Sequence, residues 1–240
     1  MFSSCKNLTG TIPALPDNLE NGEDMFDGCS SLKGDIPFLP STLTNASMMF
    51  HNCSGLDGTI ANSNLGNTKI TSAVWMFNGC TNLNGEIPGL PNTLKTATGM
   101  FKGCKKLTGD IPALPESLTG SEGMFDGCSG LDGTIANSNL VNTKITSGKS
   151  MFSGCRSLTG SIPSLPSTLT NGEYMFYECR GLTDNILDLP STLTKAGGMF
   201  WGCSSLDNVL PSKPSGLTSY ADMFYKSSIT NNGSWPSDAW

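Results

Sequence analysis

The chain has 240 residues, of which 14 % are charged and 37 % are hydrophobic, and its formal net charge is −6. Cations are too few for a surface that neutralises phosphates, so nucleic acid is not an expected partner. No apolar run reaches the roughly 18 residues that a membrane span needs. The 28 glycines and 14 prolines also exclude long helices, because both residue types break them.

The dipeptide Met-Phe recurs ten times and divides the chain into ten coils. The coils begin at Met1, Met25, Met49, Met76, Met100, Met124, Met151, Met175, Met199 and Met223. Successive starts are 24 residues apart, except that the third and sixth coils have 27 residues. The chain therefore has three super-repeats, 1–75, 76–150 and 151–225. Residues 226–240 leave the pattern and contain two of the four Trp, so we expect them to form a C-terminal cap.

Counted from its Met, each coil follows the template M-F-x-G-C-x-x-L-x-G-x-I-P-x-L-P-x-x-L. A unit this short cannot bury its apolar side chains alone, so stacked units must share one core. The template predicts a repeat solenoid over residues 1–225, in right-handed coils with short parallel strands near positions seven to twelve. Proline after Ile ends each strand, since it has no N–H for the ladder. Glycine at position four indicates a positive φ, a rule from which Ser4 and Glu178 depart.

All nine cysteines hold position five of their coils, and Ser227 takes that place in the tenth coil. Such a regular column favours buried free thiols as packing residues. Disulfides between neighbouring coils are a weaker alternative, because parallel side-chain directions give poor bridge geometry. A metal site is weaker still, since no closely spaced Cys pair is present.

Polar candidates for chemistry are few. His51 is the only histidine and precedes Cys53, but it holds a variable, outward position, so a Cys–His dyad is not favoured. Glu86 and Asp110 share position eleven in adjacent coils, which leaves a weak calcium site as an alternative to a solvated face. We therefore expect no catalytic residue, no metal site and no cofactor.

Position three changes character along the chain. It is polar or charged in the first seven coils and becomes Tyr177, Trp201 and Tyr225 in the last three. Tyr174 lies three residues before Tyr177. These four aromatic residues are the candidate binding site, because Tyr and Trp anchor interfaces. Of the two interpretations we favour the other one, in which the tail with Trp235 and Trp240 folds over these residues as a cap.

The segment MFSGCRSLTGSIPSLPSTLT at residues 151–170 resembles the BspA-like bacterial surface repeats, which are leucine-rich repeats of the Treponema pallidum type. The resemblance covers essentially residues 1–225. It implies a curved parallel solenoid on a secreted or surface-anchored protein, with roles in adhesion and in binding proteins or matrix. The family has no catalytic motif to carry over, so the resemblance implies a non-enzymatic protein.

The expected function is thus a surface-exposed binding or adhesion module that recognises a protein or glycan on a host or neighbouring cell. The alternative is a structural protein whose coils join end to end into extracellular fibres or a layer. The chain opens inside the template, without a cap or an export signal. We therefore expect it to be part of a longer extracellular or cell-surface protein.

Overall fold

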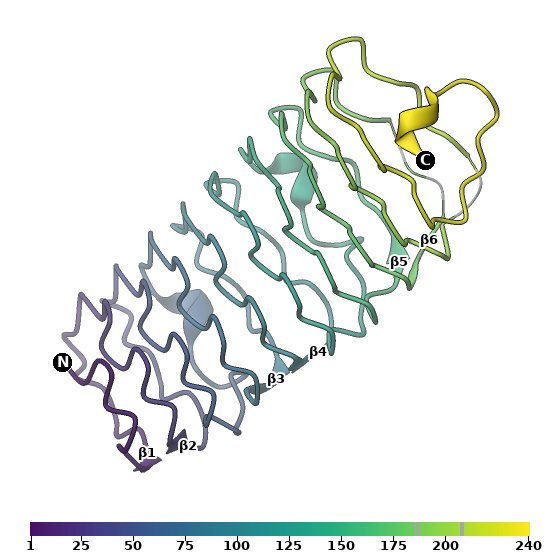
Figure 1. Cartoon of the computed structure of the whole chain (residues 1–240). Helices are drawn as coiled ribbons and strands as arrows, with labels where there is room; N and C mark the ends of the chain where they lie inside the picture. The colour runs from purple at the N-terminus through teal and green to yellow at the C-terminus, as the bar shows by residue number, and fades with distance from the viewer. Residues whose placement is uncertain (185, 187, 207–208) are drawn as a thin grey trace.

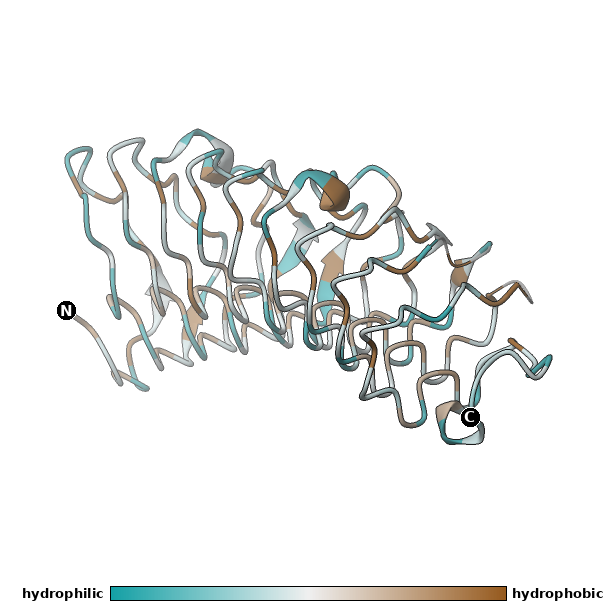
Figure 2. Cartoon of the chain, turned by 90° about the horizontal axis from the view of Figure 1, so that it is seen from above, coloured by the Kyte–Doolittle hydropathy of each residue, from teal (hydrophilic) through white to brown (hydrophobic). Residues whose placement is uncertain are grey.

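The computed structural model describes residues 1–184, 186, 188–206 and 209–240. The coils stack in sequence order, with the N-terminus at one end and the C-terminus at the other (Figure 1). None of the described residues lies in an α-helix. Hydrophobic and hydrophilic segments alternate along each coil, as Figure 2 shows from above. The expected repeat solenoid with short strands and without long helices is confirmed.

The strands pair two by two, in parallel. The pairs are β1 (Gly10–Thr11) with β2 (Leu32–Lys33), β3 (Asn84–Glu86) with β4 (Lys106–Thr108), and β5 (Gly160–Ser161) with β6 (Leu182–Thr183). All six lie between positions seven and eleven, within the predicted segment. Gly10 pairs with Leu32, so the partners differ by two template positions. Strands stay short because position ten bends the backbone, as at Gly10 with φ 90°, and a proline soon follows.

The two long coils use their extra residues to form a helical turn. These turns are the 3-10 helices η1 (Leu65–Asn67) and η2 (Leu140–Asn142). Each turn buries its leucine in the core. The extra residues are therefore accommodated without shifting the neighbouring coils. A third 3-10 helix, η3 (Ser237–Ala239), lies in the tail.

A second line of contacts between coils runs through the polar segment of the repeat, where the sequence predicted no pairing. Single parallel bridges link Asn21, Asn45, Ser72, Thr96, Gly120, Ser147, Asn171, Lys195 and Ser219 in succession. A threonine just before this line often donates its hydroxyl to the coil behind, as Thr194 does to the Thr170 carbonyl at 3.0 Å. The polar stretch therefore links neighbouring coils to one another.

The core is a set of columns, one for each apolar template position. The phenylalanine column is the most regular: its ten rings stack with centroids 5.5–6.0 Å apart and planes within 12° of parallel. The Met, Cys, Leu and Ile columns are likewise buried in the inner coils. Each Phe N–H from Phe2 to Phe200 donates to the Met carbonyl of the next coil, for example Phe101 to Met124 at 2.8 Å. The recurring Met-Phe thus supplies both packing and the hydrogen bonds between coils.

Position four has a left-handed backbone in all ten coils, whatever residue stands there. Ser4 (φ 61°) and Glu178 (φ 59°) follow this geometry although their side chains disfavour it, as does Lys226 (φ 56°). The residue before each Met is left-handed too, with φ 53–59°. The sequence did not reveal this second turn position, because Asp, Met, Trp, Ser and Tyr all occupy it besides Gly.

The tail packs on the open face of the tenth coil. Trp235 and Trp240 contact the Phe224 ring at centroid distances of 5.1 and 5.2 Å. The Trp235 indole also donates to the Pro211 carbonyl at 3.0 Å. The Ala239 carbonyl accepts the Phe224 N–H at 2.8 Å, a bond that the next coil's Met provides elsewhere. The end of η3 therefore takes the place of an eleventh coil.

Candidate binding surface

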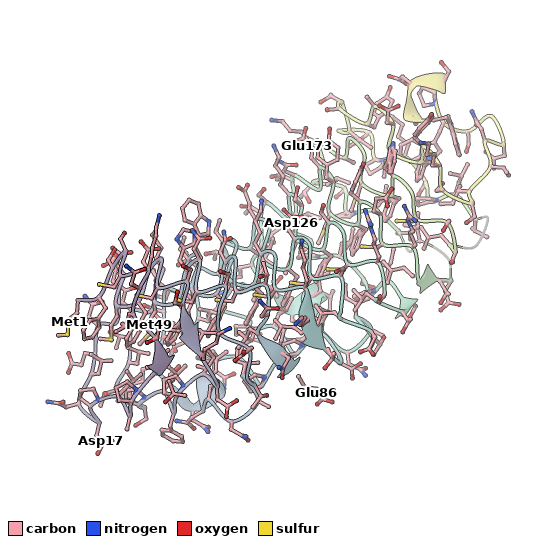
Figure 3. The ribbon with its side chains drawn as sticks, turned by 60° about the horizontal axis from the view of Figure 1, so that its bottom comes forward. Met1, Asp17, Met49, Glu86, Asp126 and Glu173 are labelled. Carbon is pink, nitrogen blue, oxygen red and sulfur yellow. The ribbon has the colours of Figure 1, made fainter. Side chains whose placement is uncertain are left out.

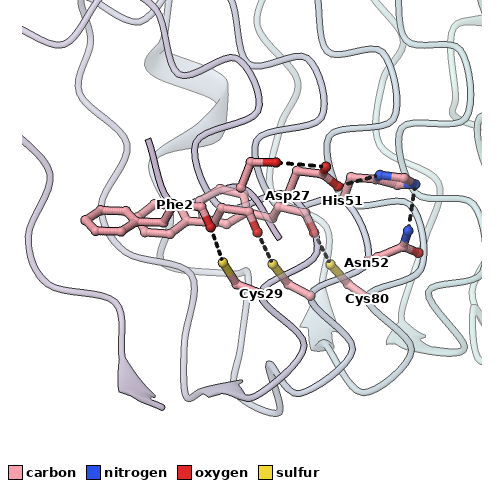
Figure 4. A network of polar contacts seen from close by, with 10 residues as sticks. Phe2, Asp27, Cys29, His51, Asn52 and Cys80 are labelled. Carbon is pink, nitrogen blue, oxygen red and sulfur yellow. Dashed lines mark hydrogen bonds and ion pairs between the residues drawn. The ribbon is translucent and has the colours of Figure 1, made fainter. Parts of the chain in front are cut away.

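The cysteine column lies against the phenylalanine backbone. Each thiol from Cys29 to Cys203 donates to the Phe carbonyl of the preceding coil, at Sγ–O distances of 2.9–3.1 Å (Figure 4). These eight thiols are free and buried, while Cys5 in the first coil is free and exposed. The prediction of buried thiols is therefore correct for eight positions and wrong for Cys5.

Burial also suppresses the reactivity of these thiols. Loss of solvation raises the pKa of Cys53 to about 12 and raises the pKa of Cys80, Cys128 and Cys179 well above the usual value. The nucleophilic form of cysteine is the thiolate, which a raised pKa disfavours. The column is therefore suited to packing and not to nucleophilic attack.

His51 belongs to a separate polar network on the outside. Its Nδ1 lies 2.8 Å from Asp27 Oδ1, its Nε2 lies 3.1 Å from Asn52 Nδ2, and Asp27 in turn accepts from Ser3 (Figure 4). The Cys53 thiol is directed to the Phe26 carbonyl instead. Both ring nitrogens and the thiol thus have other partners, and the structure does not bring His51 and Cys53 into a dyad.

Of the two carboxylates that were candidates for calcium, Asp110 has a structural role. Asp110 Oδ1 accepts the Thr134 N–H at 2.6 Å, which joins two coils. The Glu86 stem lies beside Gly109, where a side chain would collide with it. Among the residues that the structure describes, no group of three or more His, Cys, Asp or Glu could hold a metal ion.

The four predicted aromatic residues come together on one edge of the last coils. The ring centroids are 5.9 Å apart for Tyr174 and Tyr177, 4.6 Å for Tyr177 and Trp201, and 5.9 Å for Trp201 and Tyr225. Tyr174 and Tyr225 are 45 % and 43 % exposed, and the two rings between them are partly exposed. We call these four residues the aromatic strip. The tail tryptophans pack on Phe224 and have no ring contact with Tyr177, Trp201 or Tyr225 within the described part of the chain.

The edge that carries the aromatic strip lies opposite the strands. Figure 3 places Asp126 and Glu173 on one long edge and Glu86, of β3, on the other. Asp126 holds the same template position as Tyr177 and pairs with Lys102 at 2.9 Å. The same column is therefore ionic in the middle coils and aromatic in the last three.

One exposed aromatic residue of this edge was missed. Trp75 is 42 % exposed, lies over Gly99 and faces the His51 ring at a centroid distance of 5.7 Å. Tyr174 lies over Gly198 in the same manner, four coils later. An aromatic residue directly before Met, followed by Gly one coil on, is the signal that would have found it.

Cations accompany the aromatic strip. The Lys226 ammonium lies 5.0 Å from the Trp201 ring and 5.3 Å from the Tyr225 ring. Glu178, which is buried at position four, pairs with Arg180 at 2.5 Å and with Arg156 at 3.5 Å. Glu178 and Lys226 stand at position four, which the sequence indicated only as a backbone turn, while Arg156 and Arg180 stand at the variable position six. None of the four was predicted as part of a site.

Comparison with known families covers nearly the whole chain. Residues 1–90 and 44–165 match the family described as "Mycoplasma protein of unknown function, DUF285", and residues 121–234 match the "BspA type Leucine rich repeat region (6 copies)". No curated protein and no solved structure matches the chain. No described helix is long and apolar enough to cross a membrane. From its repeat pattern and these matches, the chain belongs to the BspA-like leucine-rich-repeat proteins.

Proposed function

We propose that this chain is a surface-exposed module that binds a protein partner through the aromatic strip. Its family is one of protein-interaction repeats. The observation that carries the proposal is the run of Tyr177, Trp201 and Tyr225 on successive coils, partly open to solvent at a position that is polar elsewhere. Partly exposed Tyr and Trp that are held rigid make strong anchors for a partner surface.

Ring geometry favours a protein over a glycan as the partner. Tyr177 and Trp201 stack with planes only 16° apart, so each covers a face of the other. Lys226 occupies further ring surface on Trp201 and Tyr225. Sugars that bind aromatic residues need an open ring face, whereas apolar and aromatic side chains also pack well against ring edges. Tyr177 and Trp201 therefore offer mainly ring edges, which suit a protein surface.

The proposed location is the cell surface or the extracellular space. BspA-type repeat proteins are typically surface-associated. The eight buried thiols are compatible with an oxidising environment, because oxidants attack exposed thiolates. We further propose an adhesive role without catalysis, in line with a family that is generally non-enzymatic.

The test compares binding by the wild-type chain and by the Trp201→Ser variant on arrays of matrix and cell-surface proteins and on glycan arrays. Serine occupies the same position in the first and seventh coils, as Ser3 and Ser153, so the variant should fold. Phe38→Ser is the matched control, since Phe38 is 65 % exposed and lies outside the strip.

We expect wild-type and Phe38→Ser chains to bind the same proteins and Trp201→Ser to bind them at least about tenfold more weakly, as for an interface anchor. Equal binding by Trp201→Ser would refute the role of the strip. Binding to glycans alone would refute the choice of a protein partner.

A further inference from the structure

The last three coils contain a charged hollow directly beside the aromatic strip. It has a volume of about 230 Å³ and is lined by Glu178, Arg180, Gly202, Ser204 and Lys226. Gly202 has no side chain at position four, and the Glu178 side chain of the coil before lies over it. The gap that remains is lined by Lys226 of the coil after. Lys226 also touches the strip through Trp201 and Tyr225. The hollow and the strip therefore form one continuous surface.

Both charged residues that flank the gap stand where the backbone favours glycine. Glu178 and Lys226 have φ of 59° and 56°, a conformation that costs an ordinary side chain about 1–2 kcal/mol. The other residues at position four are Gly, Ser or Asn. Strained residues of this kind persist most often at functional sites. What distinguishes these two residues is their charge: they stand on either side of Gly202, next to the aromatic part of position three.

The charges of the hollow do not cancel. Arg156 and Arg180 both approach Oε2 of Glu178, so the one carboxylate is shared by two guanidinium groups. Lys226 has no carboxylate within ion-pair distance among the described residues. The lining of the hollow thus carries two cations, Arg180 and Lys226, and one anion, Glu178, in a chain whose net charge is −6. A local positive surplus in an acidic protein favours an anionic ligand group at this place.

We infer that the hollow receives an acidic side chain of the protein partner, while apolar side chains beside it pack on the aromatic strip. The inference rests on the proposed function and adds the partner's chemistry: a segment with Asp or Glu next to an aromatic or aliphatic residue. Arg180 and Lys226 bind the carboxylate from two sides of the hollow, and the Ser204 hydroxyl, which also lines it, donates a further hydrogen bond. A hollow of this size accommodates one such side chain.

The test selects short random peptides on phage for binding to the wild-type chain. Lys226→Gly and Arg180→Ser remove the cations, and both replacements occur at these template positions in other coils. Lys105→Ser is the matched control, because Lys105 holds the position of Arg180 in a coil remote from the strip and lines a similar hollow of about 320 Å³. Trp201→Ser reports separately on the strip.

Selected peptides should contain Asp or Glu beside an apolar residue. Their affinity, measured by fluorescence polarisation, should fall about tenfold in Lys226→Gly and in Arg180→Ser, the usual cost of one lost charge contact. Lys105→Ser should bind as the wild type does. Raising the salt concentration should weaken wild-type binding and leave the residual binding of Lys226→Gly nearly constant.

The outcomes separate the two proposals. Peptides without acidic residues, or equal affinity for Lys226→Gly and wild type, overturn the acidic partner while leaving the strip as the binding surface. Peptides that bind Trp201→Ser at full strength overturn the strip itself. A third outcome is that the chain selects no peptide, while heparin beads capture the wild type and do not capture Lys226→Gly. That result shows that the hollow binds a sulfated glycan, and it overturns the acidic protein segment.

Discussion

Phenylalanine at position two and the residue at position three are neighbours in every coil, yet their columns behave differently. The inner column is Phe in all ten coils, and each of the eight rings between the two ends lies between two others at 5.5–6.0 Å. The outer column changes from Asp27 and His51 through Lys102 to Trp201. An inner residue must fit two neighbours at once, whereas an outer one faces water. Stacking therefore fixes one column and frees the other for recognition.

Among changes to the inner columns, alkaline pH should cause the largest loss of stability. The seven thiols from Cys53 to Cys203 have raised pKa values in the folded chain, because burial removes solvation, while the unfolded chain titrates near 9.0. Above that pH the unfolded state binds fewer protons, so stability falls as pH rises, by about 1.4 kcal/mol per pH unit for each thiol. Urea unfolding at several pH values measures this loss.

Two controls accompany the pH series. Replacing Cys80, Cys104 and Cys128 by Ala should make the pH dependence shallower in proportion to the thiols removed. At neutral pH, Ellman's reagent should label only Cys5 in the native chain, since it alone is exposed. A pH dependence that is unchanged in the Ala variant, or rapid labelling of several thiols, would contradict the buried column.

Replacing one ring of the phenylalanine column should lower the free energy of unfolding by less than full titration of the buried thiols does. The loss should still be large. Phe152→Ala removes a fully buried ring that is stacked on both sides, at an expected cost of about 3–5 kcal/mol. Phe38→Ala provides the comparison, because Phe38 is 65 % exposed and should change stability by no more than about 0.5 kcal/mol. Similar losses for both variants, measured by urea unfolding, would show that the columns are assigned wrongly.

We propose that residues 226–240 form a cap that protects the last rings, and a tail variant should show a smaller, local effect. Trp235→Ala removes the contact with Phe224 and the bond to the Pro211 carbonyl, at a cost of about 3 kcal/mol confined to the last coils. Hydrogen exchange should accelerate in residues 199–240 and stay constant in residues 76–150. Uniform acceleration along the chain, or none, would argue against a cap.

The smallest effect on stability is expected in the outer column. Tyr177→Ser and Trp201→Ser should shift the free energy of unfolding by about 1 kcal/mol or less, since these rings are only partly buried and Ser is found there in other coils. The same variants should lose partner binding. A loss of several kcal/mol would mean that the strip belongs to the core.

Sequence periodicity was sufficient to predict the coils, the strand segment and the core columns, because each apolar position recurs with its neighbours. It also predicted that Tyr177, Trp201 and Tyr225 lie side by side, because residues at the same template position stack in successive coils. The register in which Gly10 pairs with Leu32, two template positions apart, could not be predicted. It depends on backbone turns that the side-chain pattern does not indicate. The Glu178–Gly202–Lys226 hollow was missed for a related reason: position four was interpreted only as a turn. The packing of the tail in the place of an eleventh coil could not be predicted either, because the tail does not follow the repeat pattern and its contacts exist only in three dimensions.

The most direct test of the account is site-specific photo-crosslinking. A benzophenone amino acid replaces Tyr225 in one sample and Phe38 in another, and each chain is irradiated on cells or matrix that the wild type binds. We expect protein adducts from position 225 and none from position 38. Excess wild-type chain should suppress the adducts, and excess Trp201→Ser should not. Equal crosslinking from both positions, or adducts that Trp201→Ser suppresses as well as the wild type does, would contradict a binding surface on the aromatic strip.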